Sequence, residues 1–300
     1  MTYLNRHHQK PVGHPIGWLT GLMMKIAFMY IIIFCPANDL FVHSLCRALL
    51  EKGEEQIRVV TDTELVFASW LHEAGSNGLF FTRIRLRDGF VIEPSVIKAV
   101  VNRIPFFQMV HFINQADRSY AEMEMYALYI SFLRSIETKV TDGMQVRHIN
   151  IAEPNALYFY AMAVKAGMEV LDSQFTSSPR WRQPGKLTAM TPGKKPSALW
   201  HKRSPHLVWE NKPVLYNESF TRLVNAAVVN DTIFWPGKPV KGWQQKIKNF
   251  SRLIARTVYT LTLAEVKGKY KFYEVNTRPE IISTPAISAF AVLLMSKNSS

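Results

Sequence analysis

Lys271-Phe272-Tyr273-Glu274-Val275-Asn276-Thr277-Arg278-Pro279 is a predicted β-strand that runs into a turn, and it carries a carboxylate, an amide and a guanidinium close together. Residues i and i+2 of a strand share a face, so we expect Glu274 and Asn276 to point together, with Phe272 on the same side. Two oxygen ligands on one strand form half of a site for a hard cation such as Mg²⁺, which keeps few protein ligands and binds alongside substrate phosphates. Arg278 offers a fixed fork for phosphate or carboxylate. Taken alone, an ordinary exposed strand and a turn-capping Arg278 explain the same residues, so the rest of the chain has to decide.

The composition describes a folded, strongly basic protein. A chain of 300 residues makes one large domain or two to three packed lobes, and 48% hydrophobic residues exclude a disordered chain. The 36 Lys and Arg residues against 23 Asp and Glu residues give a net charge of +13, which predicts attraction to a nucleotide, a nucleic acid or an acidic peptide. The two cysteines, Cys35 and Cys46, form neither a metal motif nor a disulfide framework, so we expect a cytoplasmic protein.

The N-terminal segment is apolar enough to need an explanation. Residues 16–34 are largely apolar and follow a basic start, which raises a signal peptide or a membrane anchor as alternatives. Lys25 interrupts the run, and no small-residue cleavage site follows it. We therefore predict a leader over residues 1–24, then a buried strand, and no membrane insertion; an alternative start at Met23, Met24 or Met29, which would remove the leader, is left open.

Strands and helices alternate in the first part of the chain. The predicted strands cover 26–34, 57–61, 79–86 and 100–104, and the predicted helices cover 41–52 and 64–73. This alternation indicates an open α/β lobe over residues 25–115.

The later part of the chain contains two further helices and several strands. The helices cover 117–136 and 154–166, and the strands cover 214–220, 223–234, 257–263 and 270–276. The first of these helices has a predicted apolar stripe of Tyr120, Met123, Ala127, Ile130 and Leu133. Residues 180–212 form an irregular basic segment broken by Pro and Gly, and 241–256 is a second basic stretch.

Several segments together resemble the ATP-grasp ligases. Glu-Val-Asn-Thr-Arg-Pro at 274–279 resembles their metal-binding strand, and 150–176 resembles the helix before their nucleotide cleft. Residues 213–220 resemble the hinge that contacts adenine, and 221–231 the strand and turn that follow. The chain is identified as a divergent member of the ATP-grasp superfamily, similar to the glutathione synthetase-like carboxylate–amine ligases, over about residues 25–285.

The resemblance implies the fold class and the lobe order. We expect an α/β (α+β) chain whose N-terminal open α/β pre-ATP-grasp lobe, 25–115, is followed by two mixed α+β lobes. The first ATP-grasp lobe, with a helical linker, covers 116–212. The second, with the metal-binding strand, covers 213–300.

The resemblance also implies a site and its cofactors, ATP and Mg²⁺, with Mn²⁺ as an alternative metal. The implied residues are Glu274 and Asn276 as metal ligands, Lys202 at the nucleotide phosphates, Glu218 at the adenine and ribose, and Arg222 and Arg278 as catalytic residues, Arg222 facing the transferred phosphoryl group. Phosphoryl transfer to a carboxylate depends mainly on positioning and charge neutralisation, which these residue types supply.

The sequence departs from the family pattern in three places. The family usually carries an Asp on the strand before Glu-x-Asn, where this chain has Thr262, with Glu265 three residues later. Residues 183–200 contain no compact Gly-rich loop, and the Lys expected near the start of helix 154–166 is missing. Weaker metal binding, altered chemistry and loss of catalysis are all compatible with these departures.

Three functions follow from these features. The first is an ATP-dependent ligase that joins a small-molecule or peptide carboxylate to an amine through an acyl phosphate; the sequence does not fix its oligomeric state, and a homodimer is left open. The second is a non-catalytic, nucleotide-binding relative. The third is a nucleic-acid-binding protein that uses 180–212 and 238–256 as a phosphate track, ranked last because these segments carry no recognisable motif. Arg103, at the end of a buried strand, is open to a substrate role or a structural one.

Overall fold

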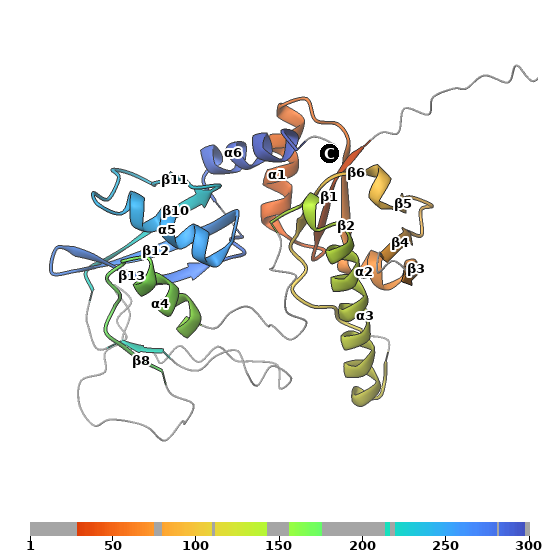
Figure 1. The fold of residues 1–300 in the computed structure, drawn as a ribbon, viewed down its shortest axis with the longest axis horizontal. Coiled ribbons are helices and arrows are strands. Elements are labelled where there is room, and N and C mark those ends of the chain that lie inside the picture. Colours follow the sequence, from red (N-terminus) through yellow and green to blue (C-terminus); the bar gives the residue numbers. More distant parts are fainter. Residues whose placement is uncertain are drawn as a thin grey trace, which may run out of the picture.

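The computed structural model describes residues 29–74, 80–109, 112–142, 156–175, 214–216, 220–280 and 282–297. Two groups of strands and helices lie side by side, with helix α6 between them (Figure 1). The predicted leader, 1–24, and the basic segment 180–212 lie outside the described residues.

The first group is built around a parallel sheet. Its elements are β1 (Tyr30–Cys35), α1 (Leu40–Glu51), β2 (Ile57–Thr61), α2 (Asp62–Val66), β3 (Ser69–Ala74), β4 (Phe80–Arg85), β5 (Val91–Ile92), η1 (Pro94–Val96), β6 (Ile97–Asn102), α3 (Gln115–Ser135), η2 (Glu137–Lys139) and β7 (Val140–Asp142). The strand order of the parallel sheet is β2-β1-β6-β7. The direction of the strand order therefore reverses between β1 and β6, and the carboxyl ends of strands at such a switch point favour ligand binding.

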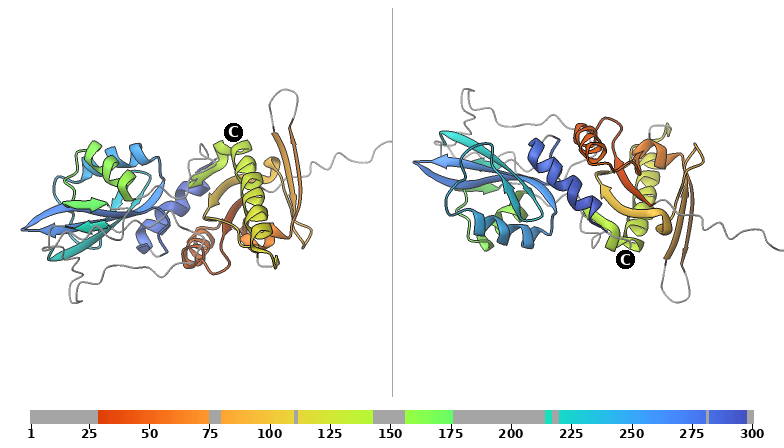
Figure 2. Two further views of the ribbon diagram at one scale, coloured as in Figure 1. Left: turned by 90° about the horizontal axis from the view of Figure 1, so that it is seen from below. Right: turned by 90° about the horizontal axis from the view of Figure 1, so that it is seen from above.

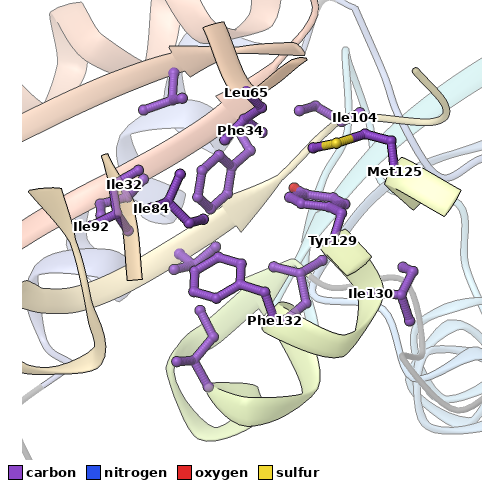
Figure 3. Packing of buried hydrophobic residues seen from close by; sticks show 14 of the residues in the cluster. Ile32, Phe34, Leu65, Ile84, Ile92, Ile104, Met125, Tyr129, Ile130 and Phe132 are labelled. Carbon is purple, nitrogen blue, oxygen red and sulfur yellow. The ribbon is translucent and has the colours of Figure 1, made fainter. Parts of the chain in front are cut away.

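Both faces of this sheet are buried, as a parallel sheet requires. Side chains of alternate residues in β1 enter two different cores: Ile32 and Phe34 face α3, and Ile31 and Ile33 face α1. Tyr129 of α3 meets the Phe34 ring edge-on at 5.6 Å (Figure 3). The apolar run predicted as the first strand is therefore a central strand.

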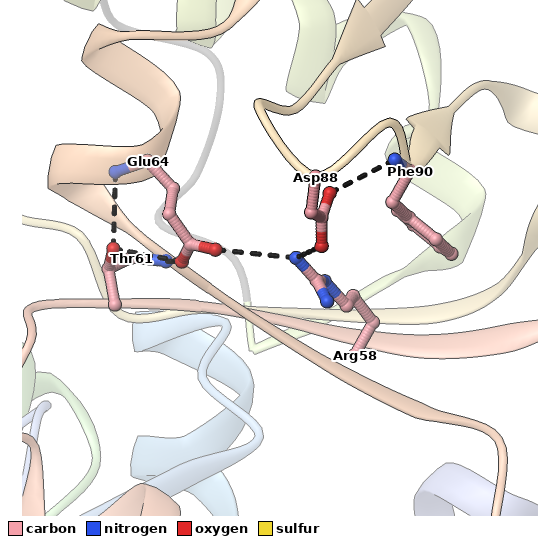
Figure 4. Close-up of polar contacts among 5 residues, drawn as sticks. All are labelled: Arg58, Thr61, Glu64, Asp88 and Phe90. Atoms are coloured by element: carbon pink, nitrogen blue, oxygen red, sulfur yellow. Dashed lines mark hydrogen bonds and ion pairs between the residues drawn. The ribbon is translucent and has the colours of Figure 1, made fainter.

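A smaller antiparallel sheet, β3-β4-β5, contributes Ile84 and Ile92 to the core under α3, and polar contacts also join it to β2. Thr61 and Glu64 form a capping box that starts α2. Arg58 donates to Glu64 at 3.3 Å and to Asp88 at 2.7 Å, and Asp88 accepts from the Phe90 amide (Figure 4). The ion pairs fix the turn before β5 against β2.

The second group is built around an antiparallel sheet. Its elements are α4 (Ala156–Lys165), β8 (Ser173–Phe175), β9 (Val214–Tyr216), β10 (Arg222–Val229), β11 (Thr232–Phe234), α5 (Gln244–Ile254), β12 (Val258–Val266), β13 (Lys269–Asn276) and α6 (Thr284–Met295). The strand order is β11-β10-β12-β13, and β8 pairs with β9 in a separate ladder. Helices α4 and α5 cover one face of the four-stranded sheet (Figure 2). The combination of a parallel and an antiparallel sheet confirms the predicted α/β (α+β) class.

Helix α6 returns from the second group to the first. Phe290 packs against Phe41 of α1, with ring centroids 6.1 Å apart, and α6 shares a core with β1 and β10. Lys297 donates to the carbonyl oxygens of Thr138 and Val140, each at 3.3 Å. In the part of the chain that the structure describes, no helix has the length and apolar character that crossing a membrane would require.

Three predicted elements differ from the structure. Residues 64–73 are not one helix, because α2 ends at Val66 and β3 begins at Ser69. Residues 223–234 are not one strand, because Asn230 and Asp231, both with positive φ, turn the chain between β10 and β11. The predicted stripe of α3 is wrong for three of its five residues, since Tyr120 and Met123 are each 64% exposed and Ala127 is exposed too. Met125 and Tyr129 are buried instead.

Candidate functional site

A β-bulge in β13 decides which side chains share a face with Glu274. Phe272 pairs with Leu263 of β12, but Glu274 pairs with the adjacent Thr262, so Tyr273 is an extra residue in the ladder. Phe272 is fully buried against α4 and α5, whereas Glu274 lies on the opposite face with Thr262. The expectation that Phe272 shares the face of Glu274 is therefore wrong, because the extra residue inverts the alternation.

Polar side chains form a row across this face of the sheet. Asn225 of β10 pairs with Thr262 of β12, which pairs in turn with Glu274 of β13. One step along, Thr260 pairs with Asn276. Glu274 and Asn276 therefore point to the same side, as the alternation of a strand after the bulge requires.

The pKa of the Glu274 carboxyl is shifted from that of an ordinary glutamate. Its side chain reaches solvent, but the surrounding protein removes part of its hydration, and this desolvation raises the pKa of the carboxyl. A hydrogen bond with the Thr262 side chain acts in the opposite direction and lowers the pKa. A bound cation would favour the ionised carboxylate that desolvation disfavours.

The turn after β13 fixes the Asn276 amide. The Arg278 backbone N–H donates to Asn276 Oδ1 at 2.8 Å, which orients the side chain and leaves the second lone pair of the oxygen for another partner. Burial raises the pKa of Tyr126 and Tyr129 in α3, and the positive charge of Arg278 acts against that rise. The Arg278 side chain therefore lies within electrostatic range of α3, in the first group of elements.

Arg103 ties the same turn to the carboxyl end of the parallel sheet. Its Nε donates to Asp39 Oδ2 at 2.6 Å, and its Nη2 donates to the Pro279 carbonyl oxygen at 3.1 Å. The guanidinium lies 4.3 Å from the centroid of the Phe41 ring, and Arg103 is only 4% exposed. Asp39 follows β1 and Arg103 follows β6, so this contact joins the turn after β13 to the switch point of the parallel sheet. Arg103 thus has a structural role.

Strand β12 places the Thr262 hydroxyl where the resemblance to the ATP-grasp ligases implies an Asp carboxylate. Thr262 faces Glu274, while Glu265 lies on the other face, opposite Arg222 and Tyr270. Among the described residues there is no cluster of three or more His, Cys, Asp and Glu side chains that could hold a metal. Glu274 and Asn276 fit one Mg²⁺ that takes its remaining ligands from phosphates and water. They do not fit a pair of metals bridged by a second protein carboxylate.

The structure brings together three of the six predicted site residues. Glu274, Asn276 and Arg278 lie on one strand and the turn that follows it. Arg222 lies on the α4 and α5 face of the same sheet, away from Glu274. Lys202 and Glu218 lie outside the described residues.

Sequence reasoning missed one residue that shapes the site. Asp39 accepts from the Phe41 amide as the N-cap of α1 and pairs with Arg103. The signal was present, since an Asp between an apolar strand and an amphipathic helix marks a helix start. Its long-range pairing with Arg103 had no such signal.

Comparisons with known proteins give matches by structure. Neither a scan of protein-family models nor a search of curated proteins finds a match. The macrocyclase MdnC of Microcystis aeruginosa, solved with its precursor peptide MdnA, is similar with a TM-score of 0.65 at 12% identity, over 90% of this chain and 100% of that chain. The ATP-grasp ligase PsnB, complexed with the precursor peptide PsnA2 and AMPPNP, has a TM-score of 0.62 at 16% identity, over 90% and 97%.

A third solved structure agrees with these two. The RiPP-associated ATP-grasp ligase of Chryseobacterium gregarium, in complex with ADP and a leader and core peptide, has a TM-score of 0.62 at 11% identity, over 91% and 98% of the two chains. All three likenesses span nearly the whole of both chains, although their sequence identity is low. The chain therefore has the ATP-grasp fold, and the resemblance predicted from its sequence is confirmed at the level of the fold.

Proposed function

We propose that this protein is an ATP-dependent ligase that joins a carboxylate to an amine through an acyl phosphate. The observation that carries the proposal is the pair of oxygen ligands, Glu274 and Asn276, on one face of β13 in a chain with the ATP-grasp fold. The fixed Asn276 amide and the desolvated Glu274 carboxyl support a cation-binding role for this face.

The residues would act mainly by positioning and charge neutralisation. Glu274 and Asn276 would hold Mg²⁺, which neutralises phosphate charge when it is bound with ATP. Arg278 would face the reacting groups from the turn, and Lys202 and Glu218 would contact the phosphates and the adenine and ribose. Arg222 is left out, because it lies on the other face of the sheet.

We further propose that the carboxylate and the amine belong to a peptide. MdnC, PsnB and the Chryseobacterium gregarium ligase were each solved with a peptide, which supports this choice over two free small molecules. A cytoplasmic location would fit a reaction that consumes ATP. A homodimer stays a prediction.

One observation favours a second candidate, a nucleotide-binding protein without ligase activity. Thr262 places a neutral hydroxyl beside Glu274, and Glu265 faces away from it. With fewer protein charges to hold the cation, Mg·ATP would bind without efficient phosphoryl transfer.

The test begins with nucleotide binding. We expect Mg·ATP to raise the melting temperature of the purified protein. The double variant Glu274→Ala, Asn276→Ala should abolish this shift. Glu265→Ala, which removes a carboxylate from the opposite face of the same sheet, should keep it. An unshifted parent protein at saturating Mg·ATP would overturn both candidates.

A second measurement separates the two candidates. ADP release is followed while a library of peptides that contain Asp, Glu and Lys is screened, and products are identified by the loss of one water in mass spectrometry. Release of ADP with a dehydrated peptide supports the ligase. A melting shift without ADP release across the library supports the non-catalytic candidate.

A further inference from the structure

A basic cavity of about 810 Å³ lies on the α4 and α5 side of the second sheet, away from Glu274. Its wall is formed by the start of β10, the loop before α5 and its first turn, and the turn between β12 and β13. Five cationic side chains line it, with one acidic one; these are Arg222, Lys238, Lys241, Lys246, Lys269 and Glu169.

In the described part of the chain these five cations form no ion pair, although Glu169 and Glu265 lie on the same side of the sheet. The ion pairs found in the described ranges all lie in the first group of elements and involve none of the five cations. Lys238, Lys241 and Lys269 are exposed, and Lys246 lies 5.4 Å from the centroid of the Trp243 ring. Like charges gathered around one cavity repel each other, and an anionic ligand would relieve that repulsion.

The start of α5 adds to the positive potential at the same place. The helix is 11 residues long and has no side-chain cap, because its N-cap residue is Trp243. The unpaired N–H groups of a first helical turn carry partial positive charge. They are oriented by the same segment, 238–246, that supplies three of the lysines.

The size and chemistry of the cavity identify the class of ligand. The five cations come from three separate segments, which is a wide spread for a single phosphate group. Four are lysines, whose flexible point charges impose no fixed bidentate geometry and can therefore reach carboxylates spaced along an extended chain. Val240 and Tyr270 add apolar wall for the stems of a peptide's side chains. We propose that this cavity binds an acidic segment of a peptide.

A peptide suits the cavity better than a nucleic acid does. Binding of single strands relies on aromatic side chains that stack on successive bases. The aromatic lining residues are Trp243, which is 5% exposed and packed in the core, and Tyr270, which is partly buried. Trp243 is therefore too buried to stack on a base, which leaves Tyr270 as the one partly exposed aromatic side chain among these lining residues.

The cavity is distinct from the proposed nucleotide site. Arg222 and Tyr270 face the α4 and α5 side, while Glu274 faces the other side of the same sheet. The protein is therefore expected to bind a ligand at each site simultaneously. Either proposal can fail without the other.

The experiment measures binding of a short fluorescein-labelled polyglutamate peptide to the full chain by fluorescence anisotropy. The double variant Lys241→Glu, Lys246→Glu is compared with Arg47→Glu, Lys52→Glu, an equal change of charge on exposed positions of α1 and its C-cap. We expect the cavity variant to bind about tenfold or more weakly, and the control variant to stay within about twofold of the parent. Both variants should keep their melting temperature and its shift with Mg·ATP.

Two competitors test the class of ligand. At matched ionic strength, inorganic phosphate should not displace the peptide, and a labelled oligothymidine of similar charge should bind more weakly than polyglutamate. Equal losses of polyglutamate affinity in the cavity and control variants would overturn the proposal, as would displacement of the peptide by phosphate. It would also be overturned if the oligothymidine bound more tightly than polyglutamate and the cavity substitutions abolished that binding.

Discussion

Thr262 lies directly opposite Glu274 across β12 and β13, and its side chain hydrogen-bonds with the Glu274 carboxyl. The neighbour of the metal-ligand candidate is therefore a neutral group. A carboxylate at the same position would add a second negative charge to the face, at the cost of repulsion when no cation is bound. If the face binds a cation as proposed, we expect this pair of residues to set how strongly the cation is attracted.

Thr262→Asp should strengthen cation binding in the presence of ATP. The new carboxylate would lie beside Glu274, so the variant should reach its full melting shift at a lower Mg²⁺ concentration than the parent protein. Without metal, the variant should melt at a lower temperature because two carboxylates then repel each other. Glu265→Gln, on the other face, should leave the Mg²⁺ dependence unchanged. A Thr262→Asp variant with the parent's Mg²⁺ dependence would place the cation elsewhere.

As the pH falls, cation binding at Glu274 should begin to weaken at a higher pH than it would at a glutamate with the ordinary pKa. Desolvation raises the pKa of this carboxyl, so protons compete with Mg²⁺ earlier as the pH falls. The Mg·ATP melting shift should therefore shrink as the pH falls through the raised pKa. The Glu274→Gln variant should show only a small Mg·ATP shift in melting temperature at every pH. A parent shift that is unchanged down to the usual glutamate pKa would contradict this assignment.

The same pKa predicts a stability effect in the absence of metal. The folded state holds the Glu274 proton more tightly than the unfolded state, so ionisation of Glu274 destabilises the fold as the pH rises above the usual glutamate pKa. Glu274→Gln, which can still accept from Thr262, should be more stable than the parent above the raised pKa. The two proteins should converge in stability below the usual pKa, which urea unfolding across pH would measure.

Breaking the buried pair of Arg103 and Asp39 should destabilise the protein strongly. Asp39→Ala leaves the Arg103 charge buried without its partner, which costs about 3–5 kcal/mol of unfolding free energy. Asp39→Asn keeps an acceptor for the Phe41 amide and thereby separates the loss of charge from the loss of the helix cap. Glu93→Ala, which breaks the more exposed pair with Arg83, should cost less than about 1 kcal/mol. Equal losses from the two alanine variants would contradict the buried role of Arg103.

Ala255→Gly should stabilise the end of α5. Ala255 has φ +48° and ψ +48°, a left-handed conformation that costs a residue with a Cβ about 1 kcal/mol or more. The same substitution at Ala289, inside the right-handed helix α6, should instead destabilise by about 1 kcal/mol. Thermal unfolding of both variants would show opposite signs, and a lower melting temperature for Ala255→Gly would refute the expectation.

Local patterns were sufficient to predict most of the strands and helices. The apolar run before Cys35 became the central strand β1, and the segment after Asp117 became helix α3, because both patterns span enough residues to set a period. The helix predicted over 64–73 failed because β3 is fixed by pairing with β4, and single-segment patterns carry no information on distant partners. The turn at Asn230-Asp231 could have been predicted from the sequence, because Asn and Asp tolerate positive φ.

The candidate site was predictable in its ligands and not in its surroundings. Glu274 and Asn276 could be named because a strand repeats every two residues. The bulge at Tyr273 could not, since it depends on how β13 pairs with β12. Alternation along β12 already separates Thr262 and Glu265 onto opposite faces, and only the register with β13 shows that Thr262 is the one beside Glu274.

The contact of α6 with α1 has a consequence for synthesis on the ribosome. Phe290 and its neighbours complete the core against Phe41 and Leu45, yet they are translated long after α1. The parallel sheet must therefore emerge with one of its faces partly uncovered, and the nascent chain is most vulnerable to aggregation in that interval. That face stays partly uncovered until helix α6 has been translated.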